Sequence, residues 1–294
     1  RFLCFNIAGH WFSPNDPPDI RGRLKVIAAN AVAQTVDVLV LQELYFFSVA
    51  GFVMRRKEVD YMESLLRPHG FTLATKAASH GMSQGLCVFS KAAAIVAQAS
   101  VPFGPQYAGI FGKLLGKPRK GCQVVDLHWP LANDRTLPLR IVNCHLDWKG
   151  STAATHLRLT KAVAAAVAAD DPLSCVVVCG DFNQQVDTFL EEEDFESYSP
   201  TQPTHDDGAR YDHVFVRRPI DPSARQQTDD ASDSDCAAIT KQVLRDLARS
   251  HPVQQSSFQR LACSQATVAD WRLPGPNGGK VSDHRALVFD IEVR

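Results

Sequence analysis

Short apolar runs that end in a polar side chain are the feature that most constrains how this chain can fold. The clearest run is Val38 to Leu41, which contains no polar residue. A strand with one face in water alternates apolar and polar residues, so an unbroken run predicts a strand covered on both faces. Such strands belong to sheets packed between other layers, which predicts an α/β domain.

The remaining pattern predicts several short strands and few crossover helices. Helices are expected at about 21–35, 60–67, 151–169 and 237–249, and Ser151 is the expected N-cap of the third. Strands are expected at 2–7, 71–75, 86–89, 94–97, 122–127, 139–144, 175–179 and 211–216, and at the end of the chain. This balance favours mixed sheets packed face to face, with helices outside, over a parallel doubly wound sheet. We expect one domain over residues 1–294, with a mobile insertion at about 217–280 that matches no motif.

Polar side chains stand at the ends of these strands. They are Asn6, Gln42 and Glu43, His145, Asp181 and Asn183, and the Asp283-His284 pair, and Asp212 begins a further strand. If the strands are neighbours, the side chains meet at one edge of the sheets, where open α/β folds commonly bind ligands.

The types of these residues point to one chemistry. Carboxylate and amide oxygens suit Mg²⁺ or Mn²⁺, and neutral amides and histidines suit an anionic phosphate. Together they predict metal-assisted attack of water on a phosphodiester. Structural explanations remain open for single residues: Asn6 could satisfy the following turn, Asp181 and Asn183 could form an Asx turn, and Asp212 could pair with Arg210.

The composition limits the binding partners and the cellular compartment that can be expected. The formal net charge is −1, which argues against a protein that grips nucleic acid through a broad basic face. The basic clusters at 55–57 and 113–120 are interpreted as solvated surface. Six of the eight cysteines lie in strand-like runs and act as small hydrophobes, and no Asn-x-Ser/Thr acceptor occurs, so a reducing, intracellular compartment is favoured.

In chain order, these positions resemble the motifs of the endonuclease/exonuclease/phosphatase superfamily. The likeness rests on Asn6, Gln42-Glu43, His145, Gly180-Asp181-Phe182-Asn183, Asp212 and Ser282-Asp283-His284, and it spans nearly the whole chain. It implies a four-layered α/β sandwich like that of pancreatic deoxyribonuclease, with two mixed β-sheets packed face to face between helical layers.

The resemblance also implies roles for the residues. Glu43 would be the principal ligand of Mg²⁺, with Mn²⁺ as an alternative, and Asn6 would lie beside it in the metal shell. His284 would be the general base or the imidazolium that stabilises the phosphate, with Asp212 orienting its ring. Asp181 would activate or position the attacking water, and Asn183 and His145 would contact the scissile phosphate. Asp283 would lie by the metal and water network.

Within the superfamily, two stretches are similar to neutral sphingomyelinases. Residues 84–91 resemble their Gly-Leu-Cys-Val-Phe-Ser-Lys strand, and Lys120-Gly121 resembles the pair that begins another strand. Apolar residues alternate with cations from Phe103 to Arg119, which fits either the headgroup boundary of a membrane or a loop packed over the core. A membrane-associated enzyme acting on a phospholipid headgroup is therefore expected.

Other functions stay open. A Mg²⁺-dependent nuclease acting on DNA or RNA would use the same residues, although the neutral charge speaks against nucleic acid as partner. A phosphoinositide phosphatase and a non-catalytic scaffold are less favoured. The sequence predicts no protein partner.

Overall fold

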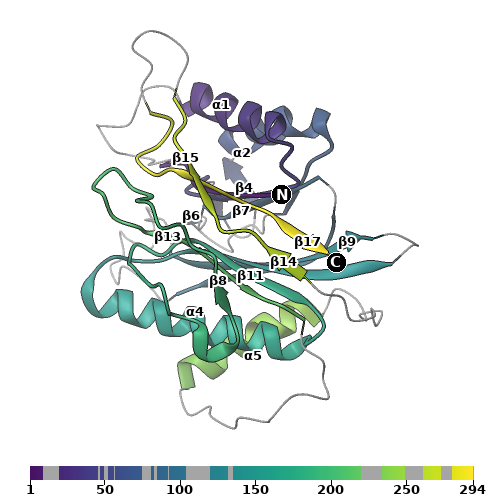
Figure 1. The fold of residues 1–294 in the computed structure, drawn as a ribbon, viewed down its shortest axis with the longest axis vertical. Coiled ribbons are helices and arrows are strands. Elements are labelled where there is room, and N and C mark those ends of the chain that lie inside the picture. The colour runs from purple at the N-terminus through teal and green to yellow at the C-terminus, as the bar shows by residue number, and fades with distance from the viewer. Residues whose placement is uncertain are drawn as a thin grey trace.

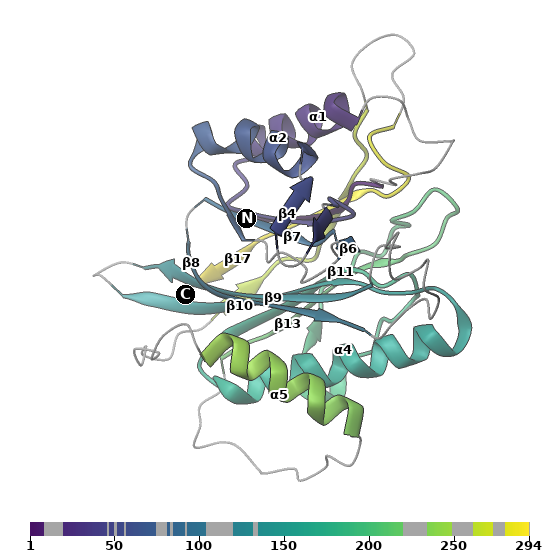
Figure 2. The ribbon, with the colours of Figure 1, turned by 180° about the vertical axis from the view of Figure 1, so that it is seen from behind.

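Two six-stranded sheets lie face to face, and helices cover the outer side of each (Figure 1; Figure 2). The computed structural model describes residues 1–8, 20–45, 47–49, 52–55, 57–74, 81–82, 85–91, 93–103, 120–131, 135–219, 234–248, 261–272 and 280–293. The layers run helix, sheet, sheet, helix, so the expected four-layered α/β sandwich is confirmed.

The first sheet combines strands from both ends of the chain. Its order is β15 (Thr267–Ala269), β16 (Ala286–Phe289), β1 (Phe2–Asn6), β2 (Val38–Gln42), β7 (Cys87–Ser90) and β5 (Thr72–Ala74). Helix α1 (Ile20–Ala33) connects β1 to β2, which is why this pair is parallel while the other pairs are antiparallel. Helix α2 (Lys57–Leu66) packs beside α1.

The second sheet repeats this plan. Its order is β12 (Glu196–Ser197), β13 (Asp212–Arg217), β11 (Cys175–Asp181), β10 (Thr136–His145), β9 (Gly121–Pro130) and β8 (Ala94–Pro102). Helix α4 (Gly150–Asp170) joins the parallel pair β10 and β11, and α5 (Ser234–Ala248) packs against α4 and β8. Two small sheets pair β14 (Leu261–Cys263) with β17 (Ile291–Val293), and β3 (Phe47–Val49) with β4 (Phe52–Arg55) and β6 (Gly81–Met82).

Both faces of the central strands β1, β2, β11 and β13 are buried, as the unbroken apolar runs predicted. Along β1, Phe2 and Cys4 face the other sheet, whereas Leu3 and Phe5 pack under α1 and α2. This alternation follows from the two-residue period of a strand. The strand is therefore covered on both faces, by the second sheet on one side and by the helices on the other.

The start of α4 differs from the prediction. Lys149 occupies the N-cap and the helix begins at Gly150, so Ser151 lies exposed inside the first turn, and the expected N-cap is wrong. The carboxylate of Asp147 accepts the backbone N–H groups of Trp148 and Lys149 at 2.8 and 3.3 Å. The side chain that organises the entry to the helix thus precedes it by several residues.

Two expected segments fall largely outside the described residues. Of the segment Phe103–Arg119, only Phe103 is described. The insertion at about 217–280 is described at 217–219, 234–248, 261–272 and 280, where it forms α5, β14 and β15. Among the described helices, none is long and apolar enough to cross a membrane.

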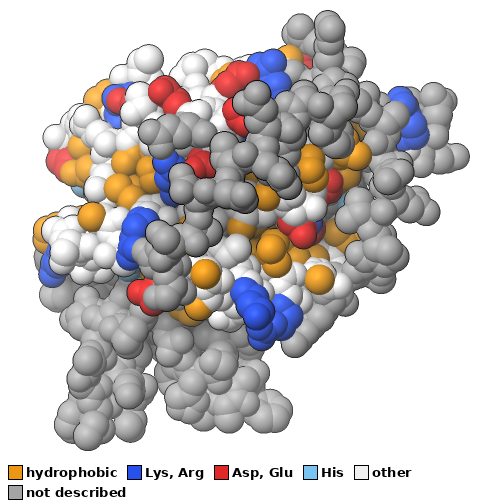
Figure 3. Space-filling model, turned by 90° about the horizontal axis from the view of Figure 1, so that it is seen from below, with side chains coloured by type: hydrophobic (Ala, Val, Ile, Leu, Met, Phe, Trp, Pro, Cys, Tyr) orange, Lys and Arg blue, Asp and Glu red, His pale blue; other side chains and the backbone are white. Residues whose placement is uncertain are grey.

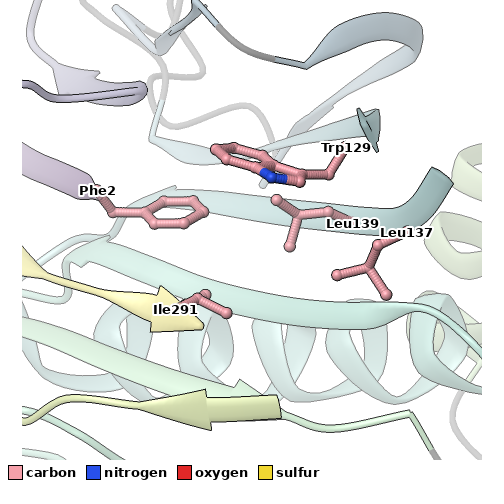
Figure 4. A pocket seen from close by; sticks show the side chains of 5 residues that line it. All are labelled: Phe2, Trp129, Leu137, Leu139 and Ile291. Atoms are coloured by element: carbon pink, nitrogen blue, oxygen red, sulfur yellow. The ribbon is translucent and has the colours of Figure 1, made fainter. Parts of the chain in front are cut away.

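Strand register brings the polar strand ends to one edge of the sandwich. Asn6 lies opposite Gln42 in the first sheet, and His145 lies opposite both Asp181 and Gly121 in the second. Gln42 ties the two sheets together because its amide donates to Asn143 Oδ1 at 2.8 Å. At the far end of the strands, a small apolar hollow is lined by Phe2, Trp129, Leu137, Leu139 and Ile291 (Figure 4).

Candidate active site

A buried cluster of acids forms where β1, β2 and β11 end. The amide nitrogen of Asn6 donates to Asp181 Oδ2 at 2.9 Å and to Glu43 Oε1 at 3.3 Å. The amide oxygen of Asn6 accepts the backbone N–H of Ala8 at 2.9 Å. Asn6 therefore serves the following turn, as one interpretation of the sequence had it, and its amide nitrogen also contacts the buried acids.

His284 closes one side of this cluster. Its Nδ1 lies 2.9 Å from Asp212 Oδ2, and its Nε2 lies 3.7 Å from Asp181 Oδ2. Burial lowers the pKa of His284, but the charges of Asp212 and Asp181 outweigh it and raise the pKa to about 10. The ring is thus held as an imidazolium at neutral pH, and its partner is Asp212, whose alternative partner Arg210 instead pairs with Asp187.

His145 closes the opposite side. Its Nε2 lies 3.4 Å from Glu43 Oε1 and 3.5 Å from Asp181 Oδ2. The ammonium of Lys120 also reaches this nitrogen. Burial lowers the pKa of Lys120, while the charges of Glu43 and Asp181 oppose that shift. Lys120 was interpreted from the sequence as part of a solvated basic surface, but in the structure it belongs to the buried cluster.

Asn183 and Asp283 occupy different surroundings. Asn183 donates from its backbone and side chain to the two oxygens of Asp181 at 2.8 and 3.1 Å, so an Asx turn forms within the cluster. Asp283, whose side chain is 44% exposed, lies at the rim 3.4 Å from Nε2 of His205. The structure therefore brings Asn183 to the buried acids and places Asp283 on the outer side of His284.

The backbone at Glu43 is strained. Its φ of +64° is in the left-handed region, which a residue with a Cβ rarely adopts. The next residue, Leu44, donates to Gly85 O at 2.9 Å, and a Cβ on Gly85 would lie 2.6 Å from the ring of Tyr45. A buried acid held in a costly conformation is typical of functional sites.

The family model described as Endonuclease/Exonuclease/phosphatase family matches residues 3–284. The chain belongs to the Endonuclease/Exonuclease/phosphatase family. Members of this family are phosphoester hydrolases that depend on a divalent metal. No curated protein matches the chain by sequence.

Solved structures of the Endonuclease/Exonuclease/phosphatase fold resemble the chain over its whole length. A mannosyl-6-phosphatase of Bacteroides thetaiotaomicron has a TM-score of 0.62 at 13% identity, covering 99% of this chain and 98% of its own. D. rerio TDP2 complexed with a single-strand DNA product has a TM-score of 0.58 at 11% identity, and beta toxin from Staphylococcus aureus has 0.58 at 12% identity. Each of these two matches covers 98% of both chains. At such identities the likeness shows the fold.

The cluster fits the divalent metal on which the family depends. Glu43 and Asp181 supply hard oxygen donors, and one ligand atom each from Asp181, Asp212 and His284 lies within 4.8 Å of the others. Burial raises the pKa of Asp181 to about 6 although His284 opposes the shift, so a bound cation would favour the ionised carboxylate. Asn6 turns its nitrogen to the acids, so ligation through its oxygen would require its amide to rotate.

The sequence assigned neither Lys120 nor His205 to the site, although the Lys120-Gly121 pair resembles a motif of neutral sphingomyelinases. Lys120 precedes Gly121, which lies opposite His145 in the sheet, so only the register of β9 and β10 reveals its position. His205 packs edge-on against the His284 ring with centroids 4.8 Å apart. An isolated antiparallel β-bridge pairs His205 with His284. The two residues are far apart in the sequence, so no local sequence pattern predicts this pairing.

Proposed function

We propose that this protein is a Mg²⁺-dependent phosphodiesterase that hydrolyses sphingomyelin or a related phosphosphingolipid to ceramide and a phosphorylated headgroup. The hydrolytic part of the proposal is carried by the buried cluster of Glu43, Asp181, His145 and the His284–Asp212 pair. Each member comes from a different strand end, and together they place carboxylates beside two imidazoles within hydrogen-bonding or ion-pair distance.

The residues would divide the reaction between them. Asp181, with a pKa of about 6, is suited to orient a water molecule and take its proton near neutral pH. Asn183 holds Asp181 through two hydrogen bonds and would contact the phosphate together with His145. His284 would donate charge-assisted hydrogen bonding to the phosphate oxygens, since Asp212 keeps it protonated.

Mg²⁺, or Mn²⁺ in its place, would be held by Glu43, with Asn6 and Asp181 beside it, and would act as a Lewis acid on the phosphate. Asp283 would act from the rim, by the metal and water network.

The lipid substrate is supported by sequence and surface features. The stretch 84–91 resembles the strand of neutral sphingomyelinases, and its described part forms β7. Trp148, three residues beyond His145, is 65% exposed, and Lys149 lies over its ring at 4.9 Å. An exposed tryptophan beside a cation suits a lipid headgroup boundary. On the face drawn in Figure 3, the described lysine and arginine side chains lie among hydrophobic and acidic ones.

A substrate panel tests the proposal. Purified protein is assayed with Mg²⁺ on sphingomyelin in mixed micelles, plasmid DNA, single-stranded RNA and a phosphoinositide. We expect turnover of sphingomyelin above the other three. Preferred cleavage of DNA or RNA would replace the lipid by a nucleic acid, and release of inorganic phosphate from the phosphoinositide would indicate a phosphatase.

Two variants test the residues, with matched controls on the surface. Glu43→Gln and His284→Ala are expected to lose activity by about 10²–10³-fold. Glu63→Gln and His69→Gln change the same residue types on α2 and in the turn that follows it, and they should retain activity. Full Mg²⁺-dependent activity in Glu43→Gln would exclude the proposed metal site, and calorimetry without Mg²⁺ binding would point to a scaffold.

A further inference from the structure

A second group of potential metal ligands lies at the rim of the site, on the outer side of His284. One ligand atom each from His205, Asp283 and His284 lies within 4.8 Å of the others. His205 is 22% exposed and Asp283 is 44% exposed at the side chain, so the group opens to solvent. It shares His284 with the buried cluster, where Nε2 of that ring lies 3.7 Å from Asp181 Oδ2, and it adds a second imidazole and a carboxylate outside the buried acids.

We infer that this rim group binds a transition-metal ion such as Zn²⁺, and that the bound ion inhibits the enzyme by engaging His284. Two imidazole nitrogens and one carboxylate are ligands that zinc accepts and that Mg²⁺ does not select, since Mg²⁺ prefers oxygen. His284 carries a proton in the metal-free site and releases it when the ion binds, so zinc binding should strengthen as pH rises. The inhibitory part rests on the proposed function, whereas the binding part does not.

The spacing of one donor pair already fits a shared ion. Nε2 of His205 lies 3.4 Å from Asp283 Oδ2. Ligands at the usual zinc distances of about 2.0–2.1 Å in a tetrahedral arrangement lie about 3.3 Å apart. This pair therefore already has the separation that a shared zinc ion requires, and a water molecule could complete the coordination.

Both histidines carry a carboxylate on their other nitrogen. Asp212 Oδ2 lies 2.9 Å from Nδ1 of His284, and Asp207 Oδ1 lies 2.9 Å from Nδ1 of His205. The backbone N–H of Asp207 lies 3.2 Å from the same His205 nitrogen and favours the opposite tautomer, but a metal on Nε2 selects the one that donates to the carboxylate. Carboxylate–histidine pairs of this kind orient ligands in metal sites.

Backbone hydrogen bonds hold the two ligand segments together. Arg285 N donates to Thr204 O at 2.8 Å, and Asp206 N donates to Asp283 O at 3.1 Å. These bonds flank the bridge between His205 and His284. The donors are thus fixed before an ion arrives, which reduces the cost of ordering them.

Zinc binding to the full chain, measured by calorimetry with Mg²⁺ saturating, tests the inference. We expect the wild-type protein to bind Zn²⁺, and His205→Gln and Asp207→Asn to weaken that binding by at least about 10-fold. His69→Gln, which changes an exposed histidine elsewhere, should bind as the wild type does. Equal affinity in the wild type and His205→Gln would overturn the rim site, because the ion would then sit on the buried acids or on thiols.

Inhibition is measured separately on the same proteins. In the presence of Mg²⁺, phosphodiester hydrolysis by His205→Gln should require at least about 10-fold more Zn²⁺ for half-inhibition than that by the wild type. Zinc binding that depends on His205 without any phosphodiesterase activity would keep the site and reject the proposed function. Zinc binding that depends on His205 but leaves hydrolysis unchanged would overturn the inhibitory part.

Discussion

Asp212→Asn isolates the charge that keeps His284 protonated. The substitution preserves the shape of the side chain but removes the carboxylate that lies 2.9 Å from Nδ1. Asp212 is the largest of the charges that raise the pKa of His284 to about 10, against the effect of burial. Breaking a buried pair leaves an uncompensated charge and costs about 3–5 kcal/mol, so metal-free Asp212→Asn should be less stable than the wild type at pH 7 by about 3 kcal/mol.

The dependence on pH has a definite sign. Because the folded pKa of about 10 exceeds the unfolded value of 6.5, this contribution is fully present below pH 6.5 and is lost as pH rises toward 10. One proton bound only in the folded state lowers the free energy of unfolding by about 1.4 kcal/mol per pH unit. Between pH 7.0 and 8.5 the wild-type protein should therefore lose about 2 kcal/mol from His284.

Urea unfolding in EDTA across this range measures the slope. Asp212→Asn should have a slope of about 1 kcal/mol per pH unit, gentler than that of the wild type. Some slope remains because Asp181 still raises the pKa of His284. The thiols and the N-terminus are common to both proteins, so their contributions cancel. Asp290→Asn, which removes an exposed partner of Arg1, should keep the wild-type slope. Parallel slopes in the wild type and Asp212→Asn would refute the assigned pairing.

Two further predictions concern the backbone and the surface beside the site. Gly180→Ala should unfold the protein or cost more than about 3 kcal/mol, since its φ is +141° and the new Cβ would lie 2.1 Å from Cys144 O. Gly208→Ala, at φ +88° with open space, should cost only about 1–3 kcal/mol, and equal losses for the two variants in urea unfolding would contradict the steric account. Trp148→Ala should lower hydrolysis of sphingomyelin in vesicles by about 10-fold while leaving a soluble phosphodiester unaffected. Equal loss on both substrates would argue against a lipid contact.

The layers of the fold could be predicted because the apolar runs report burial directly. Leu3 and Phe5 on one side of β1, and Phe2 and Cys4 on the other, leave the strand no solvent-exposed face. The same local order put Asn6, Glu43 and Asp181 at strand ends. Parallel pairing aligned these ends within each sheet, and the face-to-face packing of the two sheets brought Asp181 to Asn6. Strand burial and the positions of the strand-end residues could be predicted because they depend on neighbouring residues in the sequence and on the two-residue period of a strand.

The parts that were missed depend on contacts between distant segments. In the sequence, Lys120 is the last residue of a basic cluster. The pairing of Gly121 with His145 nevertheless places its ammonium next to His145, beside the buried acids. The left-handed backbone at Glu43 depends on Gly85, which leaves room for the ring of Tyr45. Ser151 failed as an N-cap because Asp147, before the helix, already binds the backbone amides at the turn.

The most direct test of whether the Glu43–Asp181–His284 cluster is a phosphodiesterase site is a metal titration. The protein is treated with EDTA, and hydrolysis of sphingomyelin is measured as free Mg²⁺ is raised. The wild-type protein should be inactive in EDTA and regain a saturable activity with Mg²⁺. Glu43→Gln should remain about 10²–10³-fold slower at every Mg²⁺ concentration, and Glu63→Gln should follow the wild type. Activity that survives EDTA, or that Glu43→Gln retains in full, would contradict the assignment of this cluster.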